Sequence, residues 1–310
     1  MSFMESFKKY YSGKNMIRRY ILISFILLII ILQFVRPRWG DNKTNFIWTK
    51  QVVSNPSFSN IDFAWESVPM GWKYIFNQER FDREFLLTRL NDAQFILTHK
   101  RQWLYWDYIS KKLKQNWIPQ DIQYLPMIES YLKETVVSGV WAAGIRQFMP
   151  WTAIKYGLVV NEFVDQRFDP FLSTDAVVLY LKDLYKIFND WTLVLAAYNR
   201  WEYGLQSDMQ NQFQSWYYDL YLNNETYRFV FRVLAMKYLM ENKYSYFDSS
   251  LLGNQYTLPP TKLISVWAIQ DLKIWCKDNW YSYLEIKQLN PWIRKNSLPQ
   301  WSWKIKVFKN

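Results

Sequence analysis

Cysteine and histidine are almost absent from this 310-residue chain. The single cysteine, Cys276, excludes an intramolecular disulfide and any metal site built from cysteines. The single histidine, His99, leaves few metal ligands and argues against a Ser-His-Asp triad. We therefore expect no metal and no cofactor, and any acid–base chemistry should depend on carboxylates, tyrosine or lysine.

Dense runs of basic residues are missing after the N-terminal region. The net charge is +11, but the first 38 residues hold seven Lys and Arg against a single Glu. The remaining positive charge is spread over about 270 residues. This pattern argues against a nucleic-acid partner, and it is compatible with an anionic polymer.

Aromatic residues, by contrast, are plentiful. They make up 20% of the chain, including 18 Trp, and half of all residues are apolar, which excludes a disordered or fibrous chain. Most of the Trp side chains should belong to a core. A second interpretation is that several line a cleft and stack on sugar rings or bases.

One long apolar run, residues 20–35, reaches the lower limit of what a helix needs to cross a bilayer when its neighbours are included. Five Lys or Arg precede it, which favours a cytoplasmic N-terminus. A cleaved signal peptide is the alternative, but small residues do not follow the run. We expect residues 1–38 to be a cytoplasmic tail and single-pass anchor in a bacterial inner membrane, with the rest of the chain in the periplasm.

The remaining chain divides into a helical body and a small terminal unit. Residues 39–75 and 244–264 are polar or Pro-interrupted and should be linkers. Residues 76–243 show apolar side chains at helical spacing, and Ser173 is placed to cap one of the helices. Residues 265–310 should form an α+β unit with strands at 266–269 and 303–308 and helices at 271–277 and 282–289. The expected fold class is mainly α.

Glu129 is the residue that this pattern does not explain. It lies on the apolar side of "IQYLPMIES", beside Met127, Ile128 and Tyr131, and a Gly-Ile-Arg-Gln-Phe-Met-Pro segment follows soon after. A carboxylic acid in a partly apolar cleft has a raised pKa and can donate a proton near neutral pH. A structural salt bridge is the alternative. Glu134, the nearest other carboxylate, should lie on a different face and be solvated.

Four segments, taken in order, resemble the lysozyme-like lytic transglycosylases of family 1. They are "YLPMIES", "SGVWAAGIRQFMP", "NDWTLVLAAYN" and "ETYRFVFRVLA", and the resemblance runs from about residue 81 to residue 242. It implies a helical domain like that of goose-type lysozyme and soluble lytic transglycosylases. A weaker resemblance to the LysM carbohydrate-binding module covers about residues 265–308, but the usual opening Gly-Asp-Thr is missing.

The resemblance implies that peptidoglycan is the partner and that one Glu acts twice. Glu129 would protonate the oxygen of the bond between N-acetylmuramic acid and N-acetylglucosamine, while the substrate's N-acetyl group stabilises the cationic centre. It would then take the proton of the C6 hydroxyl, which closes a 1,6-anhydro ring without water. Tyr198 would lie near Glu129 and orient it.

The resemblance also implies a set of substrate-binding residues: Ser130, Gln147, Met149, Asn199, Arg146 and Trp201. Some of them have simpler roles open to them. Ser130 could satisfy a local backbone group, Gln147 could brace its loop, and Asn199 could merely end a helix. Trp141, Arg146 and the pair Arg200-Trp201 depart from the family pattern and are expected to border the cleft.

Two other functions remain open. The first is a non-catalytic peptidoglycan-binding or scaffold protein on the same fold, since fold does not guarantee activity. The second is a hydrolysing lysozyme, which would need a second carboxylate across the cleft. The terminal unit is open to two interpretations as well, a degenerate sugar-binding module or a structural cap.

Overall fold

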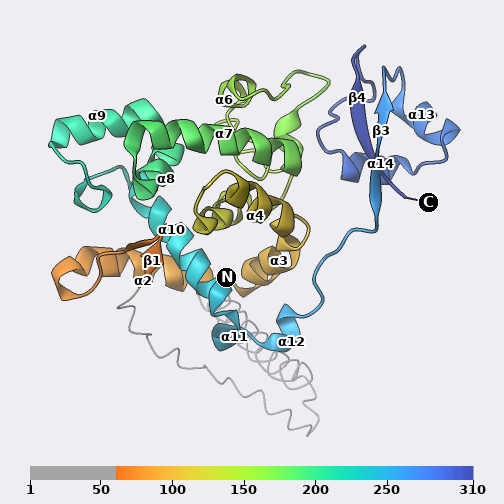
Figure 1. Cartoon of the computed structure of the whole chain (residues 1–310). Coiled ribbons are helices and arrows are strands. Elements are labelled where there is room, and N and C mark those ends of the chain that lie inside the picture. The colour runs from red at the N-terminus through yellow and green to blue at the C-terminus, as the bar shows by residue number, and fades with distance from the viewer. Residues whose placement is uncertain (1–60, 310) are drawn as a thin grey trace, which may run out of the picture. The chain divides into compact units, whose positions relative to one another are not determined.

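Helices make up most of residues 61–309, the part of the chain that the computed structural model describes (Figure 1). The mainly helical architecture expected from the sequence is confirmed. The helices of the body are α2 (Ile75–Arg89), α3 (Asp92–Gln102), α4 (Trp106–Gln115), α5 (Leu125–Ser130), α6 (Pro150–Lys155), α7 (Pro170–Phe188), α8 (Trp191–Arg200), α9 (Glu202–Gln212), α10 (Asn224–Glu241), α11 (Lys243–Tyr246) and α12 (Ser249–Leu252). Short 3₁₀ turns lie at η1 (Trp72–Tyr74), η2 (Gln120–Tyr124), η3 (Gln166–Phe168) and η4 (Tyr217–Asp219), and strands β1 (Asp62–Phe63) and β2 (Glu66–Ser67) form a small hairpin.

The core of the body is built around α8 and α10. In α8, Trp191 to Ala197 are all buried, as expected of a helix that is apolar on every side. Helix α10 packs against both α2 and α8, and α7 packs against α8 (Figure 1). These contacts bring the "LAAYN" and "ETYRFVFRV" segments, which are separate in the sequence, next to α5.

The boundaries of α7 differ from the prediction. The helix begins at Pro170, because the Asp169 carboxylate caps it by accepting hydrogen bonds from the amides of Phe171 and Leu172. Ser173, the predicted cap, is buried within the first turn. The predicted break after α7 is confirmed: Asn189 is left-handed with φ 50°, and Asp190 caps α8.

Helix α5 carries Glu129 and is very short. The η2 turn leads into it, Pro126 occupies its first turn, and it stops because Tyr131 and Leu132 are left-handed, with φ of 54° and 58°. Its buried residues are Leu125 to Ile128 and Ser130. Glu129 therefore lies in the last turn of a helix that is otherwise fixed in the core.

The terminal unit contains β3 (Thr261–Val266), α13 (Leu272–Asp278), α14 (Tyr283–Leu289) and β4 (Trp303–Phe308). The two strands are antiparallel, with Thr261 opposite Phe308 and Val266 opposite Trp303. The two helices and the last strand agree with the prediction. The first strand lies earlier than the predicted 266–269, because "TKLISV", read as part of a linker, is the segment that pairs with β4.

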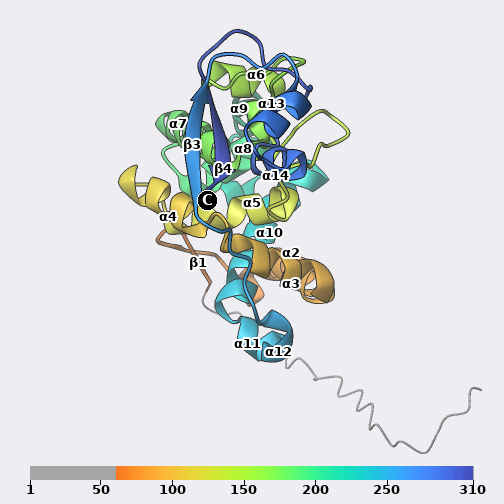
Figure 2. The ribbon, with the colours of Figure 1, turned by 90° about the vertical axis from the view of Figure 1, so that its right-hand side faces the viewer.

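The terminal unit shares a hydrophobic core with the body. Its buried residues, among them Leu272, Ile293 and Ile305, form one cluster with Ala143, Val164 and Phe168 of the body. The view turned by 90° shows β3 and β4 alongside α13 and α14 (Figure 2). The region read as a second linker, 244–264, contains most of α11, all of α12 and the start of β3.

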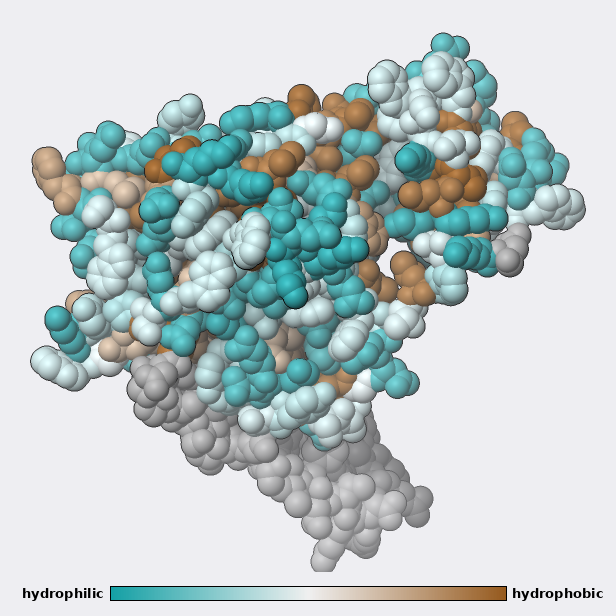
Figure 3. Space-filling view, viewed as in Figure 1, coloured by the Kyte–Doolittle hydropathy of each residue, from teal (hydrophilic) through white to brown (hydrophobic). Residues whose placement is uncertain are grey.

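The predicted membrane anchor lies outside the described residues. Within residues 61–309, none of the helices combines the length and apolar character that crossing a membrane requires. The face seen in Figure 3 is mostly hydrophilic or neutral, with scattered apolar patches.

Candidate active site

A pocket of about 380 Å³ opens beside Glu129. We call it the Glu129 pocket. Its lining comes from α5, from the segment 138–149, from α6, α7 and α8, and from the start of α10. The lining residues are Glu129, Ser138, Val140, Ala142, Gln147, Phe148, Met149, Thr152, Tyr180, Tyr198, Asn199, Trp201 and Glu225. Five of the predicted substrate or catalytic residues besides Glu129 thus meet there: Gln147, Met149, Tyr198, Asn199 and Trp201.

The Glu129 carboxyl group is half-buried and forms no hydrogen bond or ion pair with any of residues 61–309. Burial raises its pKa to about 8. The cations Arg232 and Arg146 oppose this rise, and the Glu225 carboxylate adds to it. Glu129 is therefore mostly protonated at neutral pH, as a proton donor must be.

Arg146 does not border the pocket, contrary to the prediction. Its side chain is 0% exposed and its Nη2 donates to the Thr174 hydroxyl at 3.0 Å, whereas Nε and Nη1 have no partner among the described residues. Burial lowers the pKa of this guanidinium to about 10, and the Tyr198 and Glu129 side chains oppose that change. A chain neighbour of Gln147 thus points inward, behind the pocket, and acts on Glu129 through charge.

Tyr198 lines the pocket near Glu129, but its hydroxyl does not bond the carboxyl group. It donates to the Arg146 backbone carbonyl at 2.5 Å. Burial, followed by the nearby Glu129 carboxylate, raises the Tyr198 pKa well above its usual value, so the phenol stays protonated. The hydroxyl ties α8 to the segment that carries Gln147.

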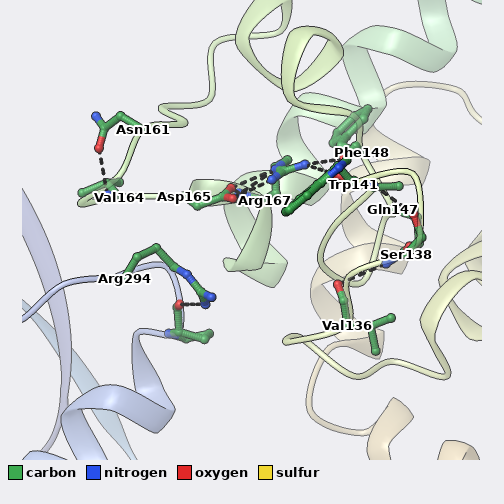
Figure 4. A network of polar contacts seen from close by, with 12 residues as sticks. Val136, Ser138, Trp141, Gln147, Phe148, Asn161, Val164, Asp165, Arg167 and Arg294 are labelled. Atoms are coloured by element: carbon green, nitrogen blue, oxygen red, sulfur yellow. Dashed lines mark hydrogen bonds and ion pairs between the residues drawn. The ribbon is translucent and has the colours of Figure 1, made fainter.

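Gln147 lies in the segment 138–149, which we call the wall segment. Its backbone is left-handed, with φ 48°, and its side-chain amide nitrogen donates to the carbonyls of Gly144 at 2.9 Å and Val136 at 3.3 Å (Figure 4). The loop-bracing role is therefore observed. The amide oxygen accepts no hydrogen bond from residues 61–309, so it remains available to a ligand in the pocket.

Glu225, at the start of α10, is a charged pocket residue that sequence reasoning missed. It is exposed and accepts a hydrogen bond from the Asn199 amide at 3.3 Å, and the Thr226 hydroxyl donates to the Asn199 oxygen at 2.8 Å. Asn199 thus joins the end of α8 to the start of α10. The "ET" of "ETYRFVFRV" carried this signal, but an acidic residue in a first helical turn is ordinarily explained by the helix dipole.

The family comparison matches the region around this pocket. Residues 107–216 match the family model described as "Transglycosylase SLT domain", a range that includes Glu129, Gln147 and Tyr198. Residues 107–216 thus resemble an SLT domain. The match is consistent with the lysozyme-like helical domain expected from the sequence.

Two named relatives resemble parts of the chain. Membrane-bound lytic murein transglycosylase D of Escherichia coli K12 is 32% identical over 149 residues, which cover 46% of this chain and 32% of that protein. A putative tributyltin chloride resistance protein of an Alteromonas species is 29% identical over 93 residues, covering 30% of this chain and 45% of that one. The chain therefore spans about a third of the length of the first relative and under half of the second.

Among solved structures, the 70 kDa soluble lytic transglycosylase of Escherichia coli aligns with 24% identity and a TM-score of 0.38. The alignment covers 49% of this chain and 27% of that one. The structure of the same 70 kDa protein in complex with bulgecin A aligns with a TM-score of 0.40 and 22% identity, over 59% of this chain and 32% of that one.

Two further predicted site residues lie where sequence reasoning did not put them. Ser130 is buried outside the pocket lining, and its hydroxyl donates to the carbonyls of Pro126 and Ile145, so its local backbone role is the observed one. Trp141 is 72% exposed and lies outside the lining as well. Trp201 does line the pocket, and its ring packs against Trp151 at 5.2 Å between centroids.

Glu134 is not the solvated carboxylate that its spacing predicted. It is half-buried and accepts a hydrogen bond from the Tyr105 hydroxyl. Burial raises its pKa. The helix that was expected to carry Glu134 onto a solvent face ends at Ser130, which explains the difference.

A second pocket, of about 530 Å³, lies next to the Glu129 pocket. Glu225 lines both, and Ile128 and Arg232 line the second one. This pocket was not predicted, because its walls come from α2, α3 and α5 and from α10, which is distant from them in the chain. Within the described residues, no three or more His, Cys, Asp or Glu side chains are grouped so that they could hold a metal ion.

Proposed function

We propose that this protein is a lytic transglycosylase that cleaves peptidoglycan between N-acetylmuramic acid and N-acetylglucosamine. The observation that carries the proposal is the Glu129 carboxyl group, which has no ion-pair partner among residues 61–309, has its pKa raised to about 8 and lines a pocket within an SLT domain. The likeness to a membrane-bound lytic murein transglycosylase supports the same substrate class.

In the proposed reaction, Glu129 gives its proton to the glycosidic oxygen, and the bond from that oxygen to C1 of the muramic acid breaks. The substrate's N-acetyl group stabilises the positive C1. The Glu129 carboxylate then takes the proton of the C6 hydroxyl, and O6 bonds to C1. The product carries a 1,6-anhydro ring, and Glu129 ends in the protonated state in which it began.

We assign supporting roles to the other lining residues. Gln147 offers its free amide oxygen to a sugar hydroxyl or N-acetyl N–H, and Met149 and Trp201 offer apolar surface for a ring. Asn199 and Tyr198 hold the C-terminal end of α8 in place. Arg146 and Ser130 act from behind the pocket, through charge and through a backbone contact.

The proposal includes a location and an anchor. The apolar run at residues 20–35 would hold the protein in the inner membrane with the catalytic domain in the periplasm, where peptidoglycan is. The terminal unit would be LysM-like, since two helices between paired strands agree with that architecture. A test is membrane fractionation, with protease access to the catalytic domain only after the outer membrane has been opened.

Release of anhydro-muropeptides from purified sacculi, followed by mass spectrometry, tests the activity. Wild-type protein should release them, and Glu129→Gln should lose at least about 10³-fold in rate, because the proton donor is removed without a change of shape. If the wild type releases nothing and still binds sacculi, the chain is a scaffold protein and the proposal is wrong.

Glu225 is the specific observation in favour of a second candidate, a hydrolysing lysozyme. It places a second carboxylate in the same pocket, as hydrolysis with two carboxylates requires. A lysozyme would release products with a reducing end, about 18 Da heavier than the anhydro form because water is added. Products of the lighter mass, with activity retained in Glu225→Gln, would exclude this candidate.

A further inference from the structure

The wall segment makes up much of the Glu129 pocket without being a helix or a long strand. Ser138, Val140, Ala142, Gln147 and Met149 all contribute to the lining. Within the segment, the amides and carbonyls of Ala143 and Phe148 pair with each other at 3.0 and 3.2 Å. So short a hairpin needs support from outside to keep one conformation.

Arg167 supplies this support through its side chain. The guanidinium is buried, and its Nη1 donates to the Trp141 carbonyl at 2.6 Å and to the Phe148 carbonyl at 3.0 Å (Figure 4). These two carbonyls lie on the two arms of the hairpin. One planar group therefore holds both arms at a fixed separation.

The backbone of Arg167 also fixes the segment. At Gly144, where φ is +76°, an added Cβ would lie 1.8 Å from the Arg167 carbonyl oxygen. Only glycine allows the two backbones to approach so closely. Gly144 is also the residue whose carbonyl accepts the Gln147 amide, so the approach sets the position of Gln147.

Asp165 connects this clamp to the terminal unit. Its carboxylate accepts from Nε and Nη2 of Arg167 at 2.9 and 2.7 Å, while its own amide donates to the Trp292 carbonyl at 2.9 Å. Next to it, Val164 forms a β-bridge with Ile293. The charged pair that holds the wall segment is thus hydrogen-bonded to the terminal unit.

The contact between the terminal unit and the body is apolar and buried as well. Ala143 of the wall segment belongs to the same hydrophobic cluster as Leu272, Ile293 and Ile305. The Arg294 amide donates to the Phe163 carbonyl at 2.8 Å, and its guanidinium lies 4.2 Å from the centre of the Phe168 ring. A module that samples glycan on a free tether would not bury such a surface.

We propose that Arg167 is a positioning residue of the Glu129 pocket, and that the terminal unit is a fixed brace that holds Arg167 and Asp165 against the wall segment. The catalytic part of the inference rests on the proposed function. The structural part, which concerns the order of the wall segment, does not depend on it.

Hydrogen exchange of the full-length protein, measured by mass spectrometry, tests the structural part. In Arg167→Lys the charge remains, but one nitrogen atom replaces a planar fork in which Nη1 binds the two carbonyls while Nε and Nη2 bind the carboxylate, so both sets of contacts cannot be kept. Exchange at Ala143 and Phe148 should rise about tenfold or more, with exchange in α10 unchanged. Arg89→Lys, at the peripheral ion pair with Asp92, is the matched control. It should leave exchange unchanged at Ala143 and Phe148 and in α10.

Ile293→Ala tests the brace itself. It trims the terminal side of the interface, so exchange at Ala143 and Phe148 should rise as in Arg167→Lys. Both substitutions loosen the same contact between Arg167 and the wall segment. The exchange rates of these two amides in the double variant should therefore exceed those in Arg167→Lys alone by less than about twofold. Unchanged exchange at these two amides in Ile293→Ala, or a rise matched in α10, overturns the proposal.

Turnover of sacculi tests the catalytic part. Arg167→Lys should lower kcat about 10- to 100-fold, since a shift of about 1 Å in a positioning group has an effect of that size. The alkaline midpoint of activity, set by Glu129, should not move. If the wild type releases no anhydro product, the proposed function is wrong. The exchange measurements then still test whether the terminal unit braces the wall segment. If exchange rises but kcat stays at the wild-type value, Arg167 orders the segment without positioning the site.

Discussion

At the scale of single residues, the site depends on keeping a carboxylic acid protonated between two cations. Arg232 and Arg146 both lower the Glu129 pKa, and burial outweighs them. Because this balance is set by a few groups, changing one of them should move the pH dependence in a direction that can be stated in advance.

Replacing Glu129 with glutamine should stabilise the protein at alkaline pH. The native pKa of about 8 lies above the ordinary value of 4.5, so the folded state holds a proton that the unfolded state releases between these values. Wild-type stability therefore falls as pH rises through this window. Denaturant unfolding should be measured at pH 5 and pH 9. The free energy of unfolding of Glu129→Gln, relative to that of the wild type, should be a few kcal/mol higher at pH 9 than at pH 5. If the difference in unfolding free energy between the two proteins were the same at pH 5 and pH 9, the raised Glu129 pKa would be contradicted.

Replacing Arg146 with methionine should raise the alkaline midpoint of activity. The wild-type midpoint should lie near pH 8, since activity is lost as Glu129 loses its proton. Without the Arg146 cation the Glu129 pKa rises further, and we expect a shift of about half to one pH unit. The pH profile of sacculus cleavage measures it. Arg101→Met removes a cation outside both pockets and should leave the midpoint in place.

At the scale of elements, short segments with unusual backbone conformations shape the pocket. Helix α5 ends at Ser130 because two left-handed residues follow. Helix α8 ends at Arg200, and the next residue, Trp201, has a positive φ of 73°. The wall segment contains three more such positions, at Trp141, Gly144 and Gln147. The lining therefore depends on turns more than on regular structure.

Gly144→Ala should destabilise the protein by at least about 2 kcal/mol, because the new Cβ would meet the Arg167 carbonyl at a left-handed position. Gly139→Ala is the control in the same segment: its added Cβ meets nothing within 4 Å, and we expect a change within about 0.5 kcal/mol. Urea unfolding of both variants gives the comparison. Equal effects would mean that the contact with Arg167 does not constrain the segment.

The elements also show how far sequence reasoning reaches. The break at Asn189-Asp190 and the helices of the terminal unit were predicted from local rules, because capping and periodicity act within a few residues. The start of α7 was misplaced because two acceptable caps, Asp169 and Ser173, lie within one turn. The strand β3 was missed because its pairing partner is far along the chain.

The site was predictable to a similar extent. Glu129 stood out because a charge on an apolar face has no ordinary explanation, and five of the other predicted residues meet it in one pocket. The inward orientation of Arg146, the approach of Glu225 and the contact of Asp165 with Trp292 depend on packing between distant segments. Periodicity and motif spacing carry no information about such packing.

At the scale of the whole described molecule, the body and the terminal unit share one hydrophobic cluster. All the described residues, 61–309, also belong to a single compact unit. A shared core couples the stability of its two sides, since neither can unfold without exposing apolar surface of the other.

Ile305→Ala should therefore destabilise the body as well as the terminal unit. Loss of this fully buried side chain should cost about 2–5 kcal/mol and lower the single Tm by at least about 5 °C. Leu263→Ala, at an exposed position of the neighbouring strand, is the control and should have little effect. Thermal unfolding followed by circular dichroism and by exchange in α8 gives the result, and two separate transitions would contradict it.

The clamp on the wall segment also limits which positions can change over time. The Arg167 guanidinium binds the Phe148 carbonyl, and the Arg167 carbonyl lies against Gly144, so substitution at Gly144 or Arg167 disturbs the segment. Val140 lines the pocket and is exposed, and the exposed Trp141 side chain takes no part in the clamp, which uses only its carbonyl. Under the proposed function, new glycan preferences can therefore arise at Val140, which lines the Glu129 pocket, while the scaffold beneath stays the same.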